Sequence, residues 1–346
     1  LVDDCTLRDL IIDGNKATGF ISGVGALNNT DSDVTISDND FKNMYCFGVE
    51  GGAGVTGLTI TGNRIDGVAS DTSKKTGVPY YGGIVFIALS AADYLIVDNT
   101  VKNVSGSYKS LAISQVSGAK NTKVSDNILH GDVIFAGSYG ASFSHNQVEG
   151  RVQVAGVVSK LKINRNTISQ PNATSAISTT ATAAYDGLEI EGNTIVGGTN
   201  GIDLTASGTA YTGVNMRGNK MVDQTNRAIN FPTCAGTLEN ISITDNEIRV
   251  GATAGTSFIG IYNQNDNVTV ARNRLSNSVG ASSRIAIYMA GASTPTLLVL
   301  DNEVRDAWAH TLYLTASSGM YARGNLLKTK TATNPTGNNI SGEIVF

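Results

Sequence analysis

Four side chains suited to acid–base chemistry lie close together in the sequence, namely His130, Asp132, Glu149 and Arg151. An acid and a base a short distance apart can cleave a polar bond, and a carboxylate beside another has its pKa raised enough to serve as the acid. We take Asp132 and Glu149 as that catalytic pair. Arg151 would hold a substrate carboxylate or hydroxyl groups, and His130 would tune the acid or act as a base. The alternative is a surface ladder of two ion pairs, Asp132 with Arg151 and His130 with Glu149.

Tyrosines form a second candidate site. Tyr262, Tyr288 and Tyr313 occupy equivalent positions in three successive repeats, and Asp203 occupies the same position two repeats earlier. Stacked phenol rings on a sheet present a flat apolar surface with polar tips, which suits sugar rings. The same rings would also stabilise the sheet by themselves or line a subunit interface. Asp203 is the second choice for a catalytic carboxylate.

A long polar insertion is the third candidate. The interval from Asn63 to Asn99 is the longest between repeats and contains Lys74, Lys75, Tyr80 and Tyr81. Insertions of this length on a regular scaffold are usually functional or mobile. We expect Tyr80 and Tyr81 to bind substrate at one wall of a groove, whereas the two lysines are equally consistent with ordinary solvated side chains.

The first two groups of residues lie within a pattern that recurs along the chain, and the insertion lies between two of its copies. Each copy reads apolar, any residue, apolar, two polar or small residues, Asn, any residue and usually another apolar residue, as in Leu188–Ile195. Alternating apolar residues are typical of a strand with one buried face, and a repeat of about 20 to 50 residues is typical of a solenoid. The asparagines are Asn15, Asn39, Asn63, Asn99, Asn127, Asn146, Asn166, Asn193, Asn219, Asn246, Asn273, Asn302 and Asn325.

This repeat predicts an all-β fold, a right-handed single-stranded parallel β-helix solenoid of about 12–13 coils. Asparagine suits the turn because it tolerates left-handed backbone angles. At the strand spacing of about 4.8 Å, its side-chain amides can bond to one another from coil to coil. We therefore predict an Asn ladder with a structural role and no catalytic one.

A later strand in each coil reads small, apolar, variable, apolar, as in Gly201–Leu204. Alternation is expected to place its first and third residues outward. The third position includes Asp203 and the three tyrosines. The first position is small except at Asp132 and Arg151, in two adjacent short coils. The first positions are Gly48, Gly83, Ala112, Asp132, Arg151, Ala176, Gly201, Ala228, Gly260, Ala286 and Thr311.

Composition argues against several classes of partner. The chain has 346 residues, 16% of them charged, and a net charge of −4. Without a block of Lys and Arg we expect no nucleic-acid partner, and without an apolar run of about 18 residues we expect no membrane insertion. Metal-ligand spacings and nucleotide-binding motifs are also missing from the sequence, so we predict no metal site and no cofactor.

The repeat also sets the domain boundaries that we expect. Residues 1–333 should form the β-helix, and residues 334–346 a C-terminal turn and short strand that lead to a small or missing terminal part. The chain starts at Leu1 and enters the repeat almost at once. Open sheet edges normally need a cover, so we expect flanking parts outside this sequence.

Over about residues 5–330 the repeat resembles the right-handed parallel β-helix proteins of the pectate-lyase-like superfamily, which include phage tailspikes and polysaccharide-degrading enzymes. Polygalacturonase-like enzymes carry Asn-Thr-Asp, Asp-Asp, Gly-His-Gly and Arg-Ile-Lys. Only Asn29–Asp31 fits that set, with none of the others downstream, and the Tyr-Gly-Phe-Asp-Pro-His run of mannuronan epimerases is absent. The tailspike group, which has no shared catalytic motif, remains the most similar.

This resemblance implies an extracellular or virion-surface, carbohydrate-active protein. We expect a tailspike-type depolymerase of a bacterial surface polysaccharide, with glycoside hydrolase favoured over lyase. A homotrimer is implied by the resemblance alone. A non-catalytic adhesin that binds a receptor glycan, or a structural fibre domain, is the alternative, because this scaffold hosts both kinds of protein.

Overall fold

A computed structural model describes residues 4–14, 22–27, 33–51, 56–68, 82–89, 93–104, 109–115, 121–172, 174–180, 184–204, 210–231, 238–251, 257–261, 265–277, 284–289, 296–306, 308, 310–314, 320–327, 339–341 and 344–345. The chain divides into two compact units, Leu1–Thr167 (unit 1) and Ile168–Phe346 (unit 2). None of the described residues forms a helix that is long and apolar enough to cross a membrane.

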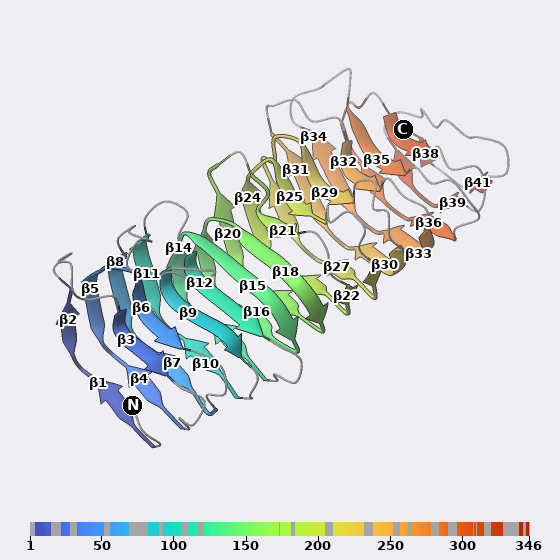
Figure 1. The fold of residues 1–346 in the computed structure, drawn as a ribbon. Coiled ribbons are helices and arrows are strands. Elements are labelled where there is room, and N and C mark those ends of the chain that lie inside the picture. The colour runs from blue at the N-terminus through green and yellow to red at the C-terminus, as the bar shows by residue number, and fades with distance from the viewer. Residues whose placement is uncertain are drawn as a thin grey trace. The chain divides into compact units, whose positions relative to one another are not determined.

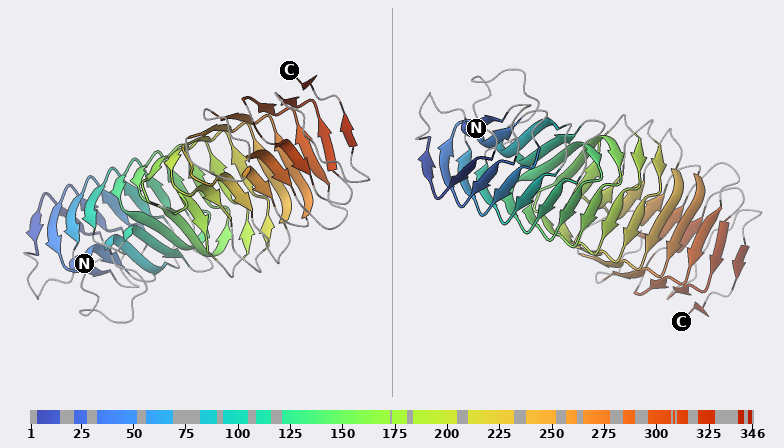
Figure 2. Two further views of the ribbon diagram at one scale, coloured as in Figure 1. Left: turned by 90° about the horizontal axis from the view of Figure 1, so that it is seen from above. Right: turned by 90° about the horizontal axis from the view of Figure 1, so that it is seen from below.

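Each coil contributes short strands that pair in parallel with their equivalents in the next coil. A first strand precedes the ladder asparagine, a second strand follows it, and a third strand follows the next corner. In the coil of Asn39 these are β4 (Thr35–Ser37), β5 (Asp40–Met44) and β6 (Phe47–Gly51). Strand β4 pairs with β7, β5 with β8 and β6 with β9. Figures 1 and 2 show this stacking within each unit, so the predicted all-β parallel solenoid is confirmed.

The other first strands of unit 1 are β1 (Thr6–Arg8), β7 (Thr59–Thr61), β10 (Leu95–Val97), β13 (Lys123–Ser125), β16 (Ser142–Ser144) and β19 (Lys162–Asn164). Its other second strands are β2 (Ile11–Asp13), β8 (Arg64–Val68), β11 (Thr100–Val104), β14 (Ile128–His130) and β17 (Gln147–Glu149). Its other third strands are β3 (Ser22–Leu27), β9 (Gly82–Leu89), β12 (Lys109–Gln115), β15 (Asp132–Tyr139) and β18 (Val152–Ser159).

In unit 2 the first strands are β23 (Glu189–Glu191), β27 (Asn215–Arg217), β30 (Leu238–Thr244), β33 (Asn265–Ala271), β36 (Leu297–Leu300), β39 (Met320–Arg323) and β41 (Asn339–Ser341), with short β22 (Tyr185–Asp186) and β26 (Tyr211–Thr212) ahead of β23 and β27. Its second strands are β20 (Thr167–Gln170), whose first residue belongs to unit 1, β24 (Thr194–Gly197), β28 (Lys220–Val222), β31 (Glu247–Val250), β34 (Arg274–Asn277), β37 (Glu303–Val304), β40 (Leu326–Leu327) and β42 (Ile344–Val345). Its third strands are β21 (Ile177–Thr179), β25 (Asn200–Asp203), β29 (Arg227–Phe231), β32 (Ser257–Ile261), β35 (Ile285–Met289) and β38 (His310–Leu314).

The predicted Asn ladder is present in both units. In unit 1 the Asn39 backbone N–H and Nδ2 donate to Asn63 Oδ1 at 3.0 and 2.9 Å, and Asn63 Nδ2 donates to the Ile36 carbonyl at 2.8 Å. In unit 2 the same bonds join Asn219 to Asn246. These amides are almost fully buried, so the hydrogen bonds compensate for lost hydration. Asn15 lies outside the described residues.

The backbone reason for asparagine was predicted wrongly. The left-handed residue is the one before each ladder asparagine, for example Asp38 with φ 56° and Asp245 with φ 59°. The described ladder asparagines do not have positive φ. Asparagine suits this position because its side-chain amide both donates and accepts hydrogen bonds along the ladder.

The first position of the third strand was also predicted wrongly, because in most coils it points inward. A Cβ on Gly48 would lie 2.7 Å from Ile65 Cγ2, and one on Gly201 would lie 3.1 Å from Met221 Sδ. Ile65 and Met221 are fully buried core residues of second strands. The first position is therefore small because it faces the second strand across the corner, where a larger side chain has no room.

The register differs from the predicted one in two coils. Ala112 pairs with Ile134, and Gly260 pairs with Tyr288, so both belong to the third position. Gly260 therefore stands in the tyrosine column, and Tyr262 lies outside the described residues. A shift by two residues leaves a period-two pattern unchanged, which is why alternation alone did not detect it.

Candidate functional site

The third position of unit 2 forms a straight line of side chains on the sheet, which we call the outer row. Consecutive members are register partners in neighbouring strands from β21 to β38. Since neighbouring strands lie about 4.8 Å apart, the four steps from β25 to β38 cover roughly 19 Å. Figure 1 shows these third strands side by side. The members are Ser178, Asp203, Asn230, Gly260, Tyr288 and Tyr313.

Two tyrosines form the aromatic end of the outer row. The rings of Tyr288 and Tyr313 are stacked, with centroids 5.4 Å apart and planes 12° apart. His310, at the start of β38, places its ring 5.1 Å from that of Tyr313. Its buried Nδ1 has no hydrogen-bond partner in the described part of the chain. The predicted stack of three phenols is therefore a pair with a histidine beside it, and Gly260 stands where the third tyrosine was expected.

The opposite end of the outer row is polar and centres on Asp203. Its carboxylate accepts hydrogen bonds from Ser175 Oγ at 2.8 Å, Asn200 Nδ2 at 2.7 Å and Asn230 Nδ2 at 2.9 Å. Arg227 in turn donates to Asn230 Oδ1. Asn200 and Arg227 each precede an outer-row residue by three positions, across the corner, so the corner brings them beside the row.

This arrangement suits a polyhydroxylated ligand. The Asp203 carboxylate is held in a fixed orientation by three donors, Gly260 leaves the middle of the row without a side chain, and the stacked phenols offer a flat apolar face. Sugars combine hydroxyl groups with an apolar ring face, so both ends match the same class of molecule. The sequence pointed to Asp203, Tyr288 and Tyr313, whereas it gave no indication of Asn200 or His310.

The structure brings Asp132 and Arg151 together in unit 1 and adds Lys109. Asp132 Oδ2 lies 3.0 Å from Lys109 Nζ and 3.1 Å from Arg151 Nη2, and the Arg151 backbone N–H donates to Oδ1 at 3.0 Å. Lys109 was missed because it pairs with Asp132 through an irregular register between β12 and β15. Its only signal in the sequence is a charge at the start of a strand.

These contacts lower the pKa of Asp132. Burial favours the neutral acid, but the hydrogen bonds from the Arg151 backbone and from Lys109, with the charges of Lys109 and Arg151, outweigh it and lower the pKa. Glu149 is not among the principal influences on this pKa. Asp132 is therefore ionised at neutral pH and cannot serve there as the general acid of the predicted pair.

His130 and Glu149 form a separate pair at the ends of β14 and β17. His130 Nδ1 lies 2.7 Å from Glu149 Oε2, and the two side chains are 42% and 56% exposed. Gly131 and Gly150, with φ of 136° and 154°, turn the chain between these strands and the third strands. Both contacts of the alternative interpretation are therefore formed, Asp132 with Arg151 as an ion pair and His130 with Glu149 as a hydrogen-bonded pair, whereas a catalytic role for these four residues stays a prediction. Tyr80 and Tyr81 lie outside the described residues.

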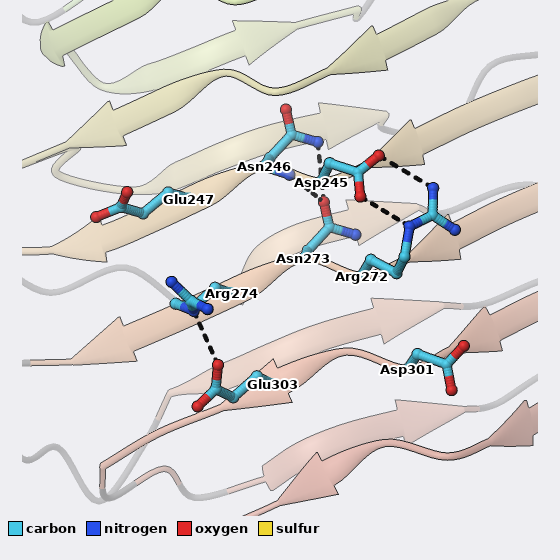
Figure 3. Close-up of a pocket in the computed structure, with 8 residues that line it drawn as sticks. All are labelled: Asp245, Asn246, Glu247, Arg272, Asn273, Arg274, Asp301 and Glu303. Atoms are coloured by element: carbon cyan, nitrogen blue, oxygen red, sulfur yellow. Dashed lines mark hydrogen bonds and ion pairs between the residues drawn. The ribbon is translucent and has the colours of Figure 1, made fainter.

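A cavity of about 430 Å³ lies in unit 2 at the turn between first and second strands that holds the ladder asparagines, which we call the Asn corner (Figure 3). The sequence analysis did not predict this cavity. Arg272 forms two bonds to Asp245, at 2.7 and 3.0 Å, and Arg274 Nε lies 2.8 Å from Glu303. The signal was present in the sequence as Asp-Asn-Glu, Arg-Asn-Arg and Asp-Asn-Glu in three successive coils. Among the described residues, no group of three or more His, Cys, Asp or Glu side chains is arranged to hold a metal ion.

Comparison with known proteins identifies the family of this chain. No curated protein matches the sequence. The crystal structure of the Dettilon tailspike protein (gp208) aligns with a TM-score of 0.36 and 12% identity over 98% of this chain and 61% of that one, so the chain spans less than two thirds of that tailspike's length. The family model described as a right-handed β-helix region matches residues 152–327, which is more than half of the sequence. The chain belongs to the right-handed β-helix family.

Proposed function

We propose that this protein binds a polysaccharide along the outer row of unit 2. The observation that carries the proposal is the stacked pair of Tyr288 and Tyr313 in line with the hydrogen-bonded carboxylate of Asp203. A glycan lying along the row would stack ring faces on the tyrosines and bond its hydroxyl groups to the polar end. The row runs across strands in a straight line, which suits an extended chain of sugars.

The test is glycan binding by two variants of one tyrosine. Tyr288→Ala removes the ring and is expected to weaken binding of a bacterial surface polysaccharide by a factor of roughly 2 to 10, whereas Tyr288→Phe keeps most of the affinity. The control is Tyr321→Ala, because Tyr321 is 49% exposed on β39 and lies off the outer row. Unchanged binding by Tyr288→Ala, with loss of oligomers instead, would show that the tyrosines form a subunit interface.

A depolymerase of the tailspike type is the second function that we propose, as a glycoside hydrolase rather than a lyase. It rests on Asp203, which three donors orient on the same row as the tyrosines, as expected for a nucleophile or base. Asp66, Asp132, Asp245 and Glu303 have lowered pKa values, which excludes them as the acid at neutral pH. The extracellular or virion-surface location and the homotrimer belong to this proposal, which draws on the resemblance to tailspikes.

Product analysis separates the two functions. Incubation with a panel of bacterial surface polysaccharides is expected to shorten one of them and to create reducing ends without the ultraviolet absorbance of an unsaturated sugar. Asp203→Asn should lower turnover by a factor on the order of 10² to 10⁴, and Asp132→Asn and Glu149→Gln test the other candidate carboxylates. New ultraviolet absorbance would indicate a lyase, and binding without shortening would indicate an adhesin.

A further inference from the structure

The cavity of unit 2 is built from the residues on either side of three ladder asparagines. Figure 3 shows Asp245, Arg272 and Asp301 along one side and Glu247, Arg274 and Glu303 along the other, with Asn246 and Asn273 between them. The asparagines are buried in the ladder, so they form a fixed floor. Each side therefore has an arginine in the middle coil and a carboxylate in the coil before and after it.

Only some of the hydrogen-bonding groups of these charged side chains bond to other described residues. Arg272 bonds to Asp245 through Nε and Nη2, and Arg274 bonds to Glu303 through Nε alone. The structure records no hydrogen bond from the remaining N–H groups of either arginine to a described residue. Glu247 and Asp301, at diagonally opposite ends in Figure 3, also form no side-chain hydrogen bond with a described residue.

The cavity therefore presents donors in its middle coil and acceptors in the coils before and after. Hydrogen bonds from Arg272 are the main cause of the lowered pKa of Asp245. For Glu303, burial opposes ionisation, but hydrogen bonds from Arg305 and Arg274 outweigh it and lower the pKa. Both carboxylates are thus ionised and accept hydrogen bonds at neutral pH. A complementary ligand must both accept from guanidinium groups and donate to carboxylates.

We propose that this cavity is a second carbohydrate site, separate from the outer row, that binds a single sugar unit through its hydroxyl groups. A hydroxyl group is a donor and an acceptor at once, so adjacent hydroxyls on one ring can bridge Arg274 and Glu247, or Arg272 and Asp301. The volume of about 430 Å³ falls within the range of small-molecule sites. Every residue that lines it is charged or carries a side-chain amide, which disfavours an apolar ligand.

Charged residues flank the ladder on both sides in three successive coils only here. The preceding ladder positions in this unit carry Gly192 with Thr194 and Gly218 with Lys220, and the following one carries Gly324 with Leu326. If every coil required ion pairs at the Asn corner, such pairs would occur along the whole ladder. A run of three coils with charges on both sides of the ladder fits a local binding role.

The experiment is titration of the full chain with unlabelled monosaccharides, followed by nuclear magnetic resonance of the arginine side chains. A neutral hexose is expected to shift the Arg272 and Arg274 Nε–H signals, and Arg274→Gln should weaken its binding about tenfold. Arg249→Gln is the matched control, because Arg249 is exposed on the same strand as Glu247 but does not line the cavity. Arg274 is 60% exposed, so its replacement leaves the core intact.

Three outcomes would overturn the proposal: no shift with any sugar, equal binding by Arg274→Gln and wild type, or binding of zwitterionic glycine in preference to sugars. The first would leave the six charges as an ion-pair ladder, and the last would identify a site for amino acids. Failure here is distinguishable from failure of the outer row, because Tyr288→Ala is expected to leave monosaccharide binding at the corner unchanged. If Tyr288→Ala abolished both polysaccharide binding at the outer row and monosaccharide binding at the Asn corner, that would count against a separate site.

Discussion

At the scale of single residues, the ladder asparagines illustrate why a buried polar group requires complete hydrogen bonding. Asn219 Oδ1 accepts from the Asn193 backbone N–H and Nδ2, and its own Nδ2 donates to Asn246 Oδ1 and the Ile190 carbonyl. Asn219→Ala would leave these partners buried without bonds. We expect a loss in the free energy of unfolding of about 1–3 kcal/mol for each group left unsatisfied.

Denaturant unfolding of Asn219→Ala against wild type measures this loss. Asn215→Ala is the control, since Asn215 lies on the preceding strand β27 and is only partly buried. Equal stability of the two variants would contradict the role assigned to the ladder.

Asp132 gives a residue-scale prediction that depends on pH. Its lowered pKa means that the folded state favours the ionised carboxylate, so the associated stability is present above the unfolded pKa of about 3.9 and is lost as pH falls through the folded pKa. Asp132→Asn should therefore cost roughly 1–3 kcal/mol at pH 7. The difference from wild type should shrink below a pH of about 4.

Unfolding curves of both proteins at pH 7 and pH 3 check this sign. Glu149→Gln provides the comparison, because its pair with His130 is exposed and is expected to contribute less than about 1 kcal/mol. A cost of Asp132→Asn that is independent of pH would show that Lys109 and Arg151 do not stabilise the ionised form.

At the scale of strands, the corner between the second and third strands restricts side-chain size. A Cβ on Gly201 would approach the Ala228 carbonyl oxygen to 2.7 Å and Met221 Sδ to 3.1 Å. Gly201→Ala is expected to destabilise unit 2 by about 1–3 kcal/mol through overpacking, and Gly201→Val by more. Thermal melting is the measurement. Val196→Ala, on the outward face of β24 in the same coil, should change stability by less than about 0.5 kcal/mol.

The same corner determines which side chains meet in the candidate site. Asn200, Arg227 and His310 start their third strands, and each contacts the outer-row residue three positions later. In a regular strand, residues three apart lie on opposite faces. Their contact shows that the turn at the corner, rather than the alternation of the strand, places these side chains along the row.

At the scale of the whole molecule, a solenoid is stabilised mainly by contacts between neighbouring coils. Damage at one coil should therefore remain local. In Asn219→Ala we expect faster hydrogen exchange in the coils of Asn193 to Asn246, whereas unit 1 keeps its protection. Hydrogen exchange followed by mass spectrometry, peptide by peptide, tests this. A uniform increase across both units would instead indicate that the chain unfolds as one cooperative unit.

The sequence alone was sufficient to predict the solenoid, the buried faces of its first and second strands and the Asn ladder. These features follow from local periodicity and from one amide repeated in every coil, so no knowledge of distant contacts was needed. Only the tertiary structure decided the register of the third strands, because a shift of two residues leaves the alternation of Leu111 and Ile113 unchanged. It also decided that the small first positions face inward, and that the Arg151 backbone N–H and Lys109 lower the pKa of Asp132. Each of these depends on which side chains from different coils meet at the corners. The residue pattern of a single coil does not specify those contacts.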